Sequence, residues 1–130
     1  MAGYSATPQA RKLGLKPGMR VRLDGAPVGW RLEGPPPLEP VAPGKPADLI
    51  LLFLREAAGI ERRLRECGEL IRPAGMLWVA WPRKAAGHVS DLGDTVIRDS
   101  ALPLGLVDTK VAAIDEDWSG LKLVWRLGER

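Results

Sequence analysis

The sequence has only one cysteine and one histidine, and each shortage excludes a class of site. Cys67 has no second cysteine with which to form a disulfide or a cysteine-built metal site, and a lone thiol suits the reducing cytoplasm. His88 cannot by itself supply a metal centre made of several histidines. Metal chemistry based on clusters of these two residue types is therefore excluded.

Long apolar runs are also absent. The longest, 49–54 and 75–81, are far too short to span a bilayer, and no apolar block follows the N-terminal charges as it would in a signal peptide. The 130 residues fit one domain, 1–130, and a composition of 45% hydrophobic and 27% charged residues is that of a soluble globular protein. We expect a single-domain cytoplasmic protein with no membrane partner.

Positive charge is concentrated near the N-terminus. Residues 1–23 carry +5 and no acid, so the rest of a chain with net charge +3 carries −2. A local basic patch can bind nucleic acid, phosphate or an acidic partner, although it can also be a solvated helix face. The candidate nucleic-acid contacts are Arg11, Lys12, Lys16 and Arg20.

Half of the twelve prolines fall in one segment, 34–46, which contains "PPPLEPVAPGKP". Proline fixes the backbone and cannot donate a hydrogen bond to a sheet, so this segment cannot form a helix or a central strand. The sequence predicts an extended surface loop of polyproline character between two core strands.

Apolar patterning predicts alternating strands and helices around this loop. Uniformly apolar runs predict parallel strands buried on both faces, and side chains at helical spacing between 60 and 71 predict a helix. Thr7 and Ser90 are suitable N-caps for a short first helix and for a helix that ends near Leu102. The expected strands are 19–24, 48–54, 75–81, 106–114 and 121–127, with the turn "DEDWSG" between the last two and Leu127 on the buried face.

This order of elements resembles the C-terminal half of class I S-adenosylmethionine-dependent methyltransferases, in which a buried strand (here after "IRPAGM"), a helix and a strand–turn–strand pair follow one another. The resemblance implies a three-layer, Rossmann-like α/β fold with a truncated, five-stranded sheet. The implied strand order is 19–24, 48–54, 75–81, 121–127, 106–114, mostly parallel, with 121–127 antiparallel.

A second resemblance is to a family of small bacterial proteins of unknown function. It rests on "GYSATPQARKLGLKPG", "GMLWVAWPRKAAG" and "LPLGLVDTKVAAIDEDWSGLKLVWR", which together cover well over half of the chain. No activity is assigned to that family, so the resemblance bears on the fold more than on the function.

The stretch "VRLDGAPVGW" decides whether a methyltransferase cofactor loop is present. Such a loop needs small residues and backbone N–H groups aimed at the ligand. Pro27 removes an N–H and adds a ring, and Asp24 stands directly before Gly25 rather than two residues earlier. No strand is expected before Glu39 to present a ribose-binding acid. We expect no bound S-adenosylmethionine or other cofactor, and a strand-end turn covered by Trp30.

The sequence does not match the motifs of other enzyme classes either. His88, Ser90 and Asp91 have the chemistry of a catalytic triad, but no nucleophile elbow presents the serine. The acidic turn 115–117 indicates a solvated hairpin tip rather than a cation site. No residue is predicted to be catalytic.

The carboxyl edge of the predicted sheet remains the candidate ligand site, because ligands of open α/β sheets bind outside the carboxyl ends of the strands. The "DGAP" and "WPRK" turns are expected to meet there, with Tyr4, Ser5 and Thr7 folded over them. Their side chains would provide stacking, anion binding and a proton carrier for a small anionic ligand. The candidate site residues are Asp24, Gly25, Ala26, Pro27, Trp81, Arg83, Lys84 and His88.

Three functions remain open. The first is a non-catalytic binding module on a methyltransferase-like scaffold, acting through a protein partner or a small ligand. The second is an enzyme or sensor for a small anionic metabolite, and the third is nucleic-acid binding through the basic N-terminal segment. The alternative to a ligand site is that Trp81 caps the core and the nearby cations are solvated. An edge strand, 19–24 or 106–114, could also form a homodimer.

Overall fold

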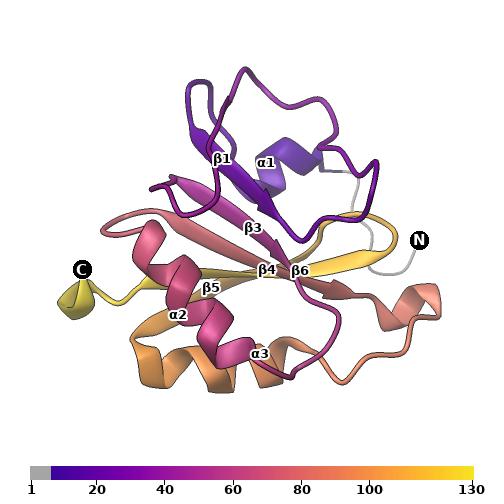
Figure 1. The fold of residues 1–130 in the computed structure, drawn as a ribbon. Coiled ribbons are helices and arrows are strands. Elements are labelled where there is room, and N and C mark those ends of the chain that lie inside the picture. The colour runs from indigo at the N-terminus through magenta and orange to yellow at the C-terminus, as the bar shows by residue number, and fades with distance from the viewer. Residues whose placement is uncertain (1–6) are drawn as a thin grey trace.

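The computed structural model describes residues 7–130, which form one mixed sheet with helices on its faces (Figure 1). No helix in this part of the chain has the length and apolar character needed to cross a membrane. The strands are β1 (Arg20–Asp24), β2 (Glu39–Pro40), β3 (Leu49–Phe53), β4 (Met76–Pro82), β5 (Leu106–Ala113) and β6 (Trp118–Trp125). The helices are α1 (Gln9–Leu13), α2 (Ile60–Leu70) and α3 (Asp94–Ala101), with 3₁₀ turns at Lys84–Ala86, Leu102–Leu104 and Leu127–Glu129.

The strand order is β2-β1-β3-β4-β6-β5, and β6 runs antiparallel to both of its neighbours while the other pairs are parallel. The order predicted for the five longer strands is therefore confirmed. The number five was wrong, because the proline-rich segment supplies the sixth strand, β2. Backbone N–H groups of Glu39 and Val41 donate to the carbonyls of Met19 and Val21, so the intervening Pro40 needs no donor towards β1.

The addition of β2 also corrects the expected edges of the sheet. Its register pairs Glu39 with Arg20 and Pro40 with Val21, so the first half of β1 is covered. At the opposite end, β5 is an edge strand, with a register shift between Asp108 and Lys110. A bulge of this kind interrupts the regular ladder that edge-to-edge pairing requires.

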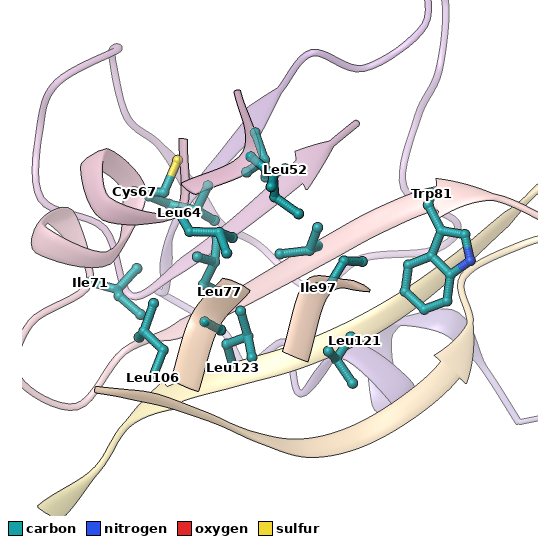
Figure 2. Packing of buried hydrophobic residues seen from close by; sticks show 14 of the residues in the cluster. Leu52, Leu64, Cys67, Ile71, Leu77, Trp81, Ile97, Leu106, Leu121 and Leu123 are labelled. Atoms are coloured by element: carbon teal, nitrogen blue, oxygen red, sulfur yellow. The ribbon is translucent and has the colours of Figure 1, made fainter. Parts of the chain in front are cut away.

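Two hydrophobic clusters lie on the two faces of the sheet. One face is covered by α2 and α3, and the other by the five-residue α1 and the proline-rich loop (Figure 1). All five residues of β3 are buried, as expected for a strand covered on both faces. Figure 2 shows the cluster on the α2 and α3 face, in which Leu64 and Ile97 pack onto Leu77 and Leu121.

Several of the predicted ends of helices and strands were wrong. The N-cap of α1 is Pro8 rather than Thr7, and α3 begins at Asp94, because Gly93 rather than Ser90 is its N-cap. The Ser90 hydroxyl is engaged earlier in the loop, where it donates to the carbonyl of Arg55 and accepts from the N–H of Leu92.

The last strand also begins earlier than predicted. Trp118, Ser119 and Gly120 were assigned to a turn, but they pair with Pro82, Trp81 and Ala80 as the first residues of β6. The strand ends at Trp125, so Leu127 lies beyond it and is exposed rather than on the buried face. This shift of three residues places two aromatic side chains, Trp81 and Trp118, at the carboxyl edge of β4.

Candidate functional site

The carboxyl end of β1 is closed on the α2 face by an ion-pair cluster. Asp24 Oδ2 accepts from Arg22 Nη2 at 2.7 Å and from Arg63 Nη2 at 2.6 Å, and the aspartate side chain is 13% exposed. Both arginines bind the same carboxylate oxygen, so the acid that ends β1 anchors α2 to the sheet. It is not presented to a ligand.

The other face of this strand end is closed by aromatic rings. The backbone N–H of Trp30 donates to Pro27 O at 3.0 Å, and the Trp30 indole packs edge-on against Phe53 with 4.9 Å between ring centroids. Gly25 adopts φ +75°, and a Cβ added there would lie 2.9 Å from the carbonyl oxygen of Phe53. The glycine thus allows the turn to pack against β3, and Ala26 and Trp30 pack against the core of the same face.

The side chains of the last two residue pairs between β4 and β6 lie on opposite faces of the sheet. Trp81 pairs with Ser119, and Pro82 pairs with Trp118. Because successive strand residues alternate between faces, Trp81 packs with α2 and α3 while Trp118 packs with Phe53 on the α1 face, with 5.0 Å between ring centroids. Each of these pairs borders a hollow, one on each face.

The first hollow, which we call the lysine hollow, lies on the α3 side and has a volume of about 500 Å³. Lys84 is exposed and makes no ion pair with any residue of 7–130. Gly93, the N-cap of α3, has no side chain to cap the first amides of the helix. The Asp94 carboxylate is directed to Arg98 at 3.4 Å. The residues that line it are Trp81, Arg83, Lys84, Ala85, Leu92, Gly93, Asp94, Val111, Ala112, Ala113 and Ser119.

The charged group of Arg83, which also lines this hollow, is bound to backbone carbonyls of the protein. It is 7% exposed, and its Nη1 donates to the carbonyls of Glu116 at 2.8 Å and Asp115 at 3.3 Å. Its backbone N–H donates to Asp117 O at 2.8 Å. The guanidinium therefore fixes the turn between β5 and β6. The sequence had predicted either a ligand contact or a solvated side chain for Arg83, and neither prediction included this structural role.

The second hollow, which we call the histidine hollow, has a volume of about 480 Å³ and is lined by Arg55, Pro82, His88, Val89, Asp117 and Trp118. His88 Nε2 lies 2.9 Å from Asp117 Oδ1. The Arg55 guanidinium carbon lies 5.3 Å from the centroid of the Trp118 ring, and Arg55 Nη1 donates to Gly25 O at 3.3 Å. No carboxylate of the described residues forms an ion pair with Arg55.

The five indole N–H groups divide into two sets. Trp30 donates to Asp115 Oδ2 at 2.8 Å, Trp78 to Leu13 O at 3.0 Å and Trp125 to Gly68 O at 2.7 Å. Trp81 and Trp118 are each 7% exposed, yet neither indole donates to a described residue. In residues 7–130 no fully buried side-chain nitrogen lacks a partner, so these two indole nitrogens reach the surface.

The two surface-reaching indoles are those that line the two hollows. In the view of Figure 2, Trp81 lies at the end of the hydrophobic cluster, with its nitrogen on the side away from Ile97. Each hollow thus contains a side chain that is more than nine-tenths buried and has one unused hydrogen-bond donor.

The structure separates the predicted site residues into three places. Asp24, Gly25, Ala26 and Pro27 lie at the closed end of β1, while Trp81, Arg83 and Lys84 border the lysine hollow. His88 lines the histidine hollow on the other face. Tyr4 and Ser5, which were expected to fold over this edge, lie outside the described residues.

Four residues that line the hollows were not among the predicted site residues, although the stretch 54–56 was expected at this edge and the turn 115–117 was considered as a cation site; they are Arg55, Asp117, Trp118 and Ser119. Arg55 carried a usable signal, because it follows the buried strand β3 almost directly at the carboxyl edge. Trp118 and Ser119 could not be found, because their assignment to a turn concealed the pairs that they form with β4.

The basic N-terminal residues do not form one patch of free charges. Lys12 is 5% exposed, its Nζ donates to Ala113 O at 2.9 Å, and burial lowers its pKa. Arg20 is held by Asp48 through hydrogen bonds of 3.0 and 3.3 Å. Arg11 and Lys16 remain exposed.

Two further classes of site receive no support from the geometry. Residues 7–130 contain no group of three or more histidine, cysteine, aspartate or glutamate side chains that could hold a metal ion. Cys67 is buried, and this burial raises the pKa of its thiol to about 11, which disfavours the reactive thiolate.

Comparison with known proteins supports the class of fold. No family model and no curated protein matches the sequence. Among 40 matching chains of solved structures is one described as "a putative methyltransferase from Thermoplasma acidophilum". It is similar over 88% of this chain and 71% of its own, with a TM-score of 0.53 and 7% sequence identity. The fold is therefore methyltransferase-like, and at this identity the likeness concerns the fold alone.

Proposed function

We propose that this protein is a non-catalytic binding module that holds a small anionic ligand in the lysine hollow. The observation that carries the proposal is that Trp81, a residue 7% exposed, lines the hollow and that its indole N–H donates to no described residue. Because the indole nitrogen reaches the surface, its N–H is free to donate to an acceptor on a ligand.

The other polar groups of the hollow are also mainly donors. The Ser119 hydroxyl makes no hydrogen bond with a described residue, and Lys84 adds an unpaired positive charge. The uncapped amides at the start of α3 add the positive end of a helix dipole. The nearby acid, Asp94, is already paired with Arg98. A carboxylate or phosphate group complements this set of donors, and Val111 supplies an apolar wall.

The same geometry supports binding rather than catalysis. A serine nucleophile needs a base within hydrogen-bonding reach, and Ser119 contacts none among residues 7–130. The imidazole of His88 belongs to the hollow on the opposite face of the sheet. The proposal also excludes S-adenosylmethionine as the ligand, because the end of β1 is closed by Asp24 with its two arginines and by Trp30.

The proposal also covers the family and the cellular compartment of the protein. It groups the chain with the small cytoplasmic bacterial proteins whose sequence stretches it resembles. It disfavours nucleic-acid binding through Arg11, Lys12, Lys16 and Arg20, since Lys12 is buried and Arg20 is ion-paired.

A calorimetric titration with inorganic phosphate as the probe tests the proposal. The wild-type chain should bind phosphate, and Lys84→Gln and Ser119→Ala should each weaken binding, the lysine change by about tenfold since it removes a charge-assisted contact. Lys45→Gln is the matched control, because Lys45 is an exposed lysine of the proline-rich loop far along the chain from this hollow. Equal affinities of the Lys84 and Lys45 variants, or tight binding of S-adenosylmethionine, would contradict the proposal.

A further inference from the structure

The histidine hollow is independent of the site proposed above. It lies on the other face of the sheet and shares no lining residue with the lysine hollow. We propose that it binds a free α-amino acid with an apolar side chain, whose carboxylate and ammonium groups meet complementary charges in the hollow.

The carboxylate half of the site consists of two donors. The Trp118 indole is 7% exposed, borders the hollow and donates to no described residue. The Arg55 guanidinium lies over the ring of Trp118 at 5.3 Å and has no carboxylate partner in residues 7–130. An arginine over the ring of a tryptophan brings two kinds of donor to one hollow, and a carboxylate group accepts from both.

The ammonium half of the site is the Asp117 carboxylate. His88 Nε2 contacts Oδ1 at 2.9 Å, and no hydrogen bond to a described residue occupies Oδ2. The backbone of Asp117 is fixed from two sides, because its N–H donates to Asp115 Oδ1 at 2.8 Å and its carbonyl accepts from the Arg83 N–H at 2.8 Å. The Asp117 carboxylate is therefore anchored through its backbone, and its free oxygen can accept from an ammonium group.

The walls of the hollow are apolar. Val89 is 98% exposed, and Pro82 and the Trp118 ring form the remaining apolar lining. A valine so fully exposed gains from contact with an apolar ligand side chain. The volume of about 480 Å³ is within the range of small-molecule pockets. With an apolar amino acid as the ligand, five of the six lining residues would contact it, and the sixth, His88, holds the Asp117 carboxylate.

The test uses L-leucine and its two half-charged analogues, 4-methylvalerate, which lacks the ammonium group, and isoamylamine, which lacks the carboxylate. Calorimetric titration of the full chain should show leucine binding at least about tenfold more tightly than either analogue, because only leucine meets both charges. No binding of leucine, or equal binding of leucine and 4-methylvalerate, would overturn the proposal.

Variants then locate the site. Asp117→Asn retains an acceptor for His88 but removes the charge, so it should weaken leucine binding about tenfold while leaving 4-methylvalerate unchanged. Arg55→Gln should weaken leucine and 4-methylvalerate together. Glu116→Gln is the matched control, since it removes an acid from the same turn and its side chain does not line the hollow.

The two proposals fail separately. Lys84→Gln should leave leucine affinity unchanged, and Asp117→Asn should leave phosphate affinity unchanged. Loss of leucine binding on Lys84→Gln would overturn the assignment to the histidine hollow, whereas absent phosphate binding with intact leucine binding would count only against the lysine hollow.

Discussion

Trp78 and Trp125 differ from Trp81 and Trp118 in what their indole N–H groups do, although all four are strongly buried. Trp78 donates to the carbonyl of Leu13 in α1, and Trp125 donates to the carbonyl of Gly68 near the end of α2. Carbonyls in the last turn of a helix have no partner within the helix, so these indoles join the ends of helices to the sheet.

Trp81 and Trp118 are located at the carboxyl edge of β4, and neither indole donates to a residue of 7–130. Their rings complete the core on the two faces, while their nitrogens border the two hollows. The comparison teaches that the same residue type serves the scaffold where its donor is satisfied and forms a candidate binding surface where its donor is free. Four predictions bear on this distinction.

The largest effect is expected for Trp78→Phe. It shrinks a fully buried ring and leaves the Leu13 carbonyl unpaired, so the free energy of unfolding should fall by about 3 kcal/mol. Trp81→Phe leaves no acceptor unpaired and borders open space, so about 1 kcal/mol is expected. Urea denaturation measures both, and equal losses would remove the distinction between the two sets.

A rise in pH above 9 should destabilise the core near α2. Burial raises the pKa of the Cys67 thiol from 9.0 to about 11, so the folded state keeps a proton that the unfolded state loses above pH 9. The contribution of the protonated thiol to the free energy of unfolding should therefore be fully present below pH 9. It should be lost, by about 2 kcal/mol, as the pH rises through 11. The matched variant is Cys67→Ala, whose stability should lack this part of the alkaline loss. Identical alkaline profiles for both proteins would show that the thiol does not contribute.

Overpacking beside Trp78 is expected to have the third-largest effect. In Gly120→Ala the new Cβ would lie 2.6 Å from Ile114 Cδ1 and 3.0 Å from Trp78 Cε3, so the stability should fall by about 1–2 kcal/mol. Gly128→Ala is the control, because no atom lies within 4 Å of the Cβ position. If both variants unfold at the same denaturant concentration, the packing around Trp78 is looser than described.

The smallest effect is expected at the hollows themselves. Lys84 and Arg55 are exposed and make no ion pair with the described residues, so Lys84→Gln and Arg55→Gln should each change stability by less than about 0.5 kcal/mol. Thermal unfolding of the two variants beside wild type checks this. A loss of several degrees in either melting temperature would place that side chain in the scaffold.

Much of the fold could be predicted because its signals are local. The buried strands β3 and β4 are uniformly apolar, and the side chains of α2 follow helical spacing, so the order of the five longer strands was correct. The ends of elements were less predictable. Ser90 is a suitable N-cap by type, but its hydroxyl is bound to Arg55 O, a partner 35 residues away.

Half of the candidate site could also be predicted. The rule that ligands bind at the carboxyl edge led to Trp81, Lys84 and His88, each of which borders a hollow. It also led to Asp24, which the structure pairs with Arg63 in α2, and it missed Asp117 and Trp118. A charged residue type does not show whether its partner will be a ligand or another side chain, since the partner comes from a distant part of the chain.

The broken loop after β1 and the alternation of apolar segments follow from the order of residues alone, because proline chemistry and hydrophobic periodicity act within a few residues. Tertiary packing set which indole N–H groups have no acceptor among the described residues. Trp78 and Trp81 lie three positions apart in one strand, yet one meets the end of α1 and the other lines a hollow. A hydrogen bond depends on the position of its acceptor, and that position is set when distant segments pack together.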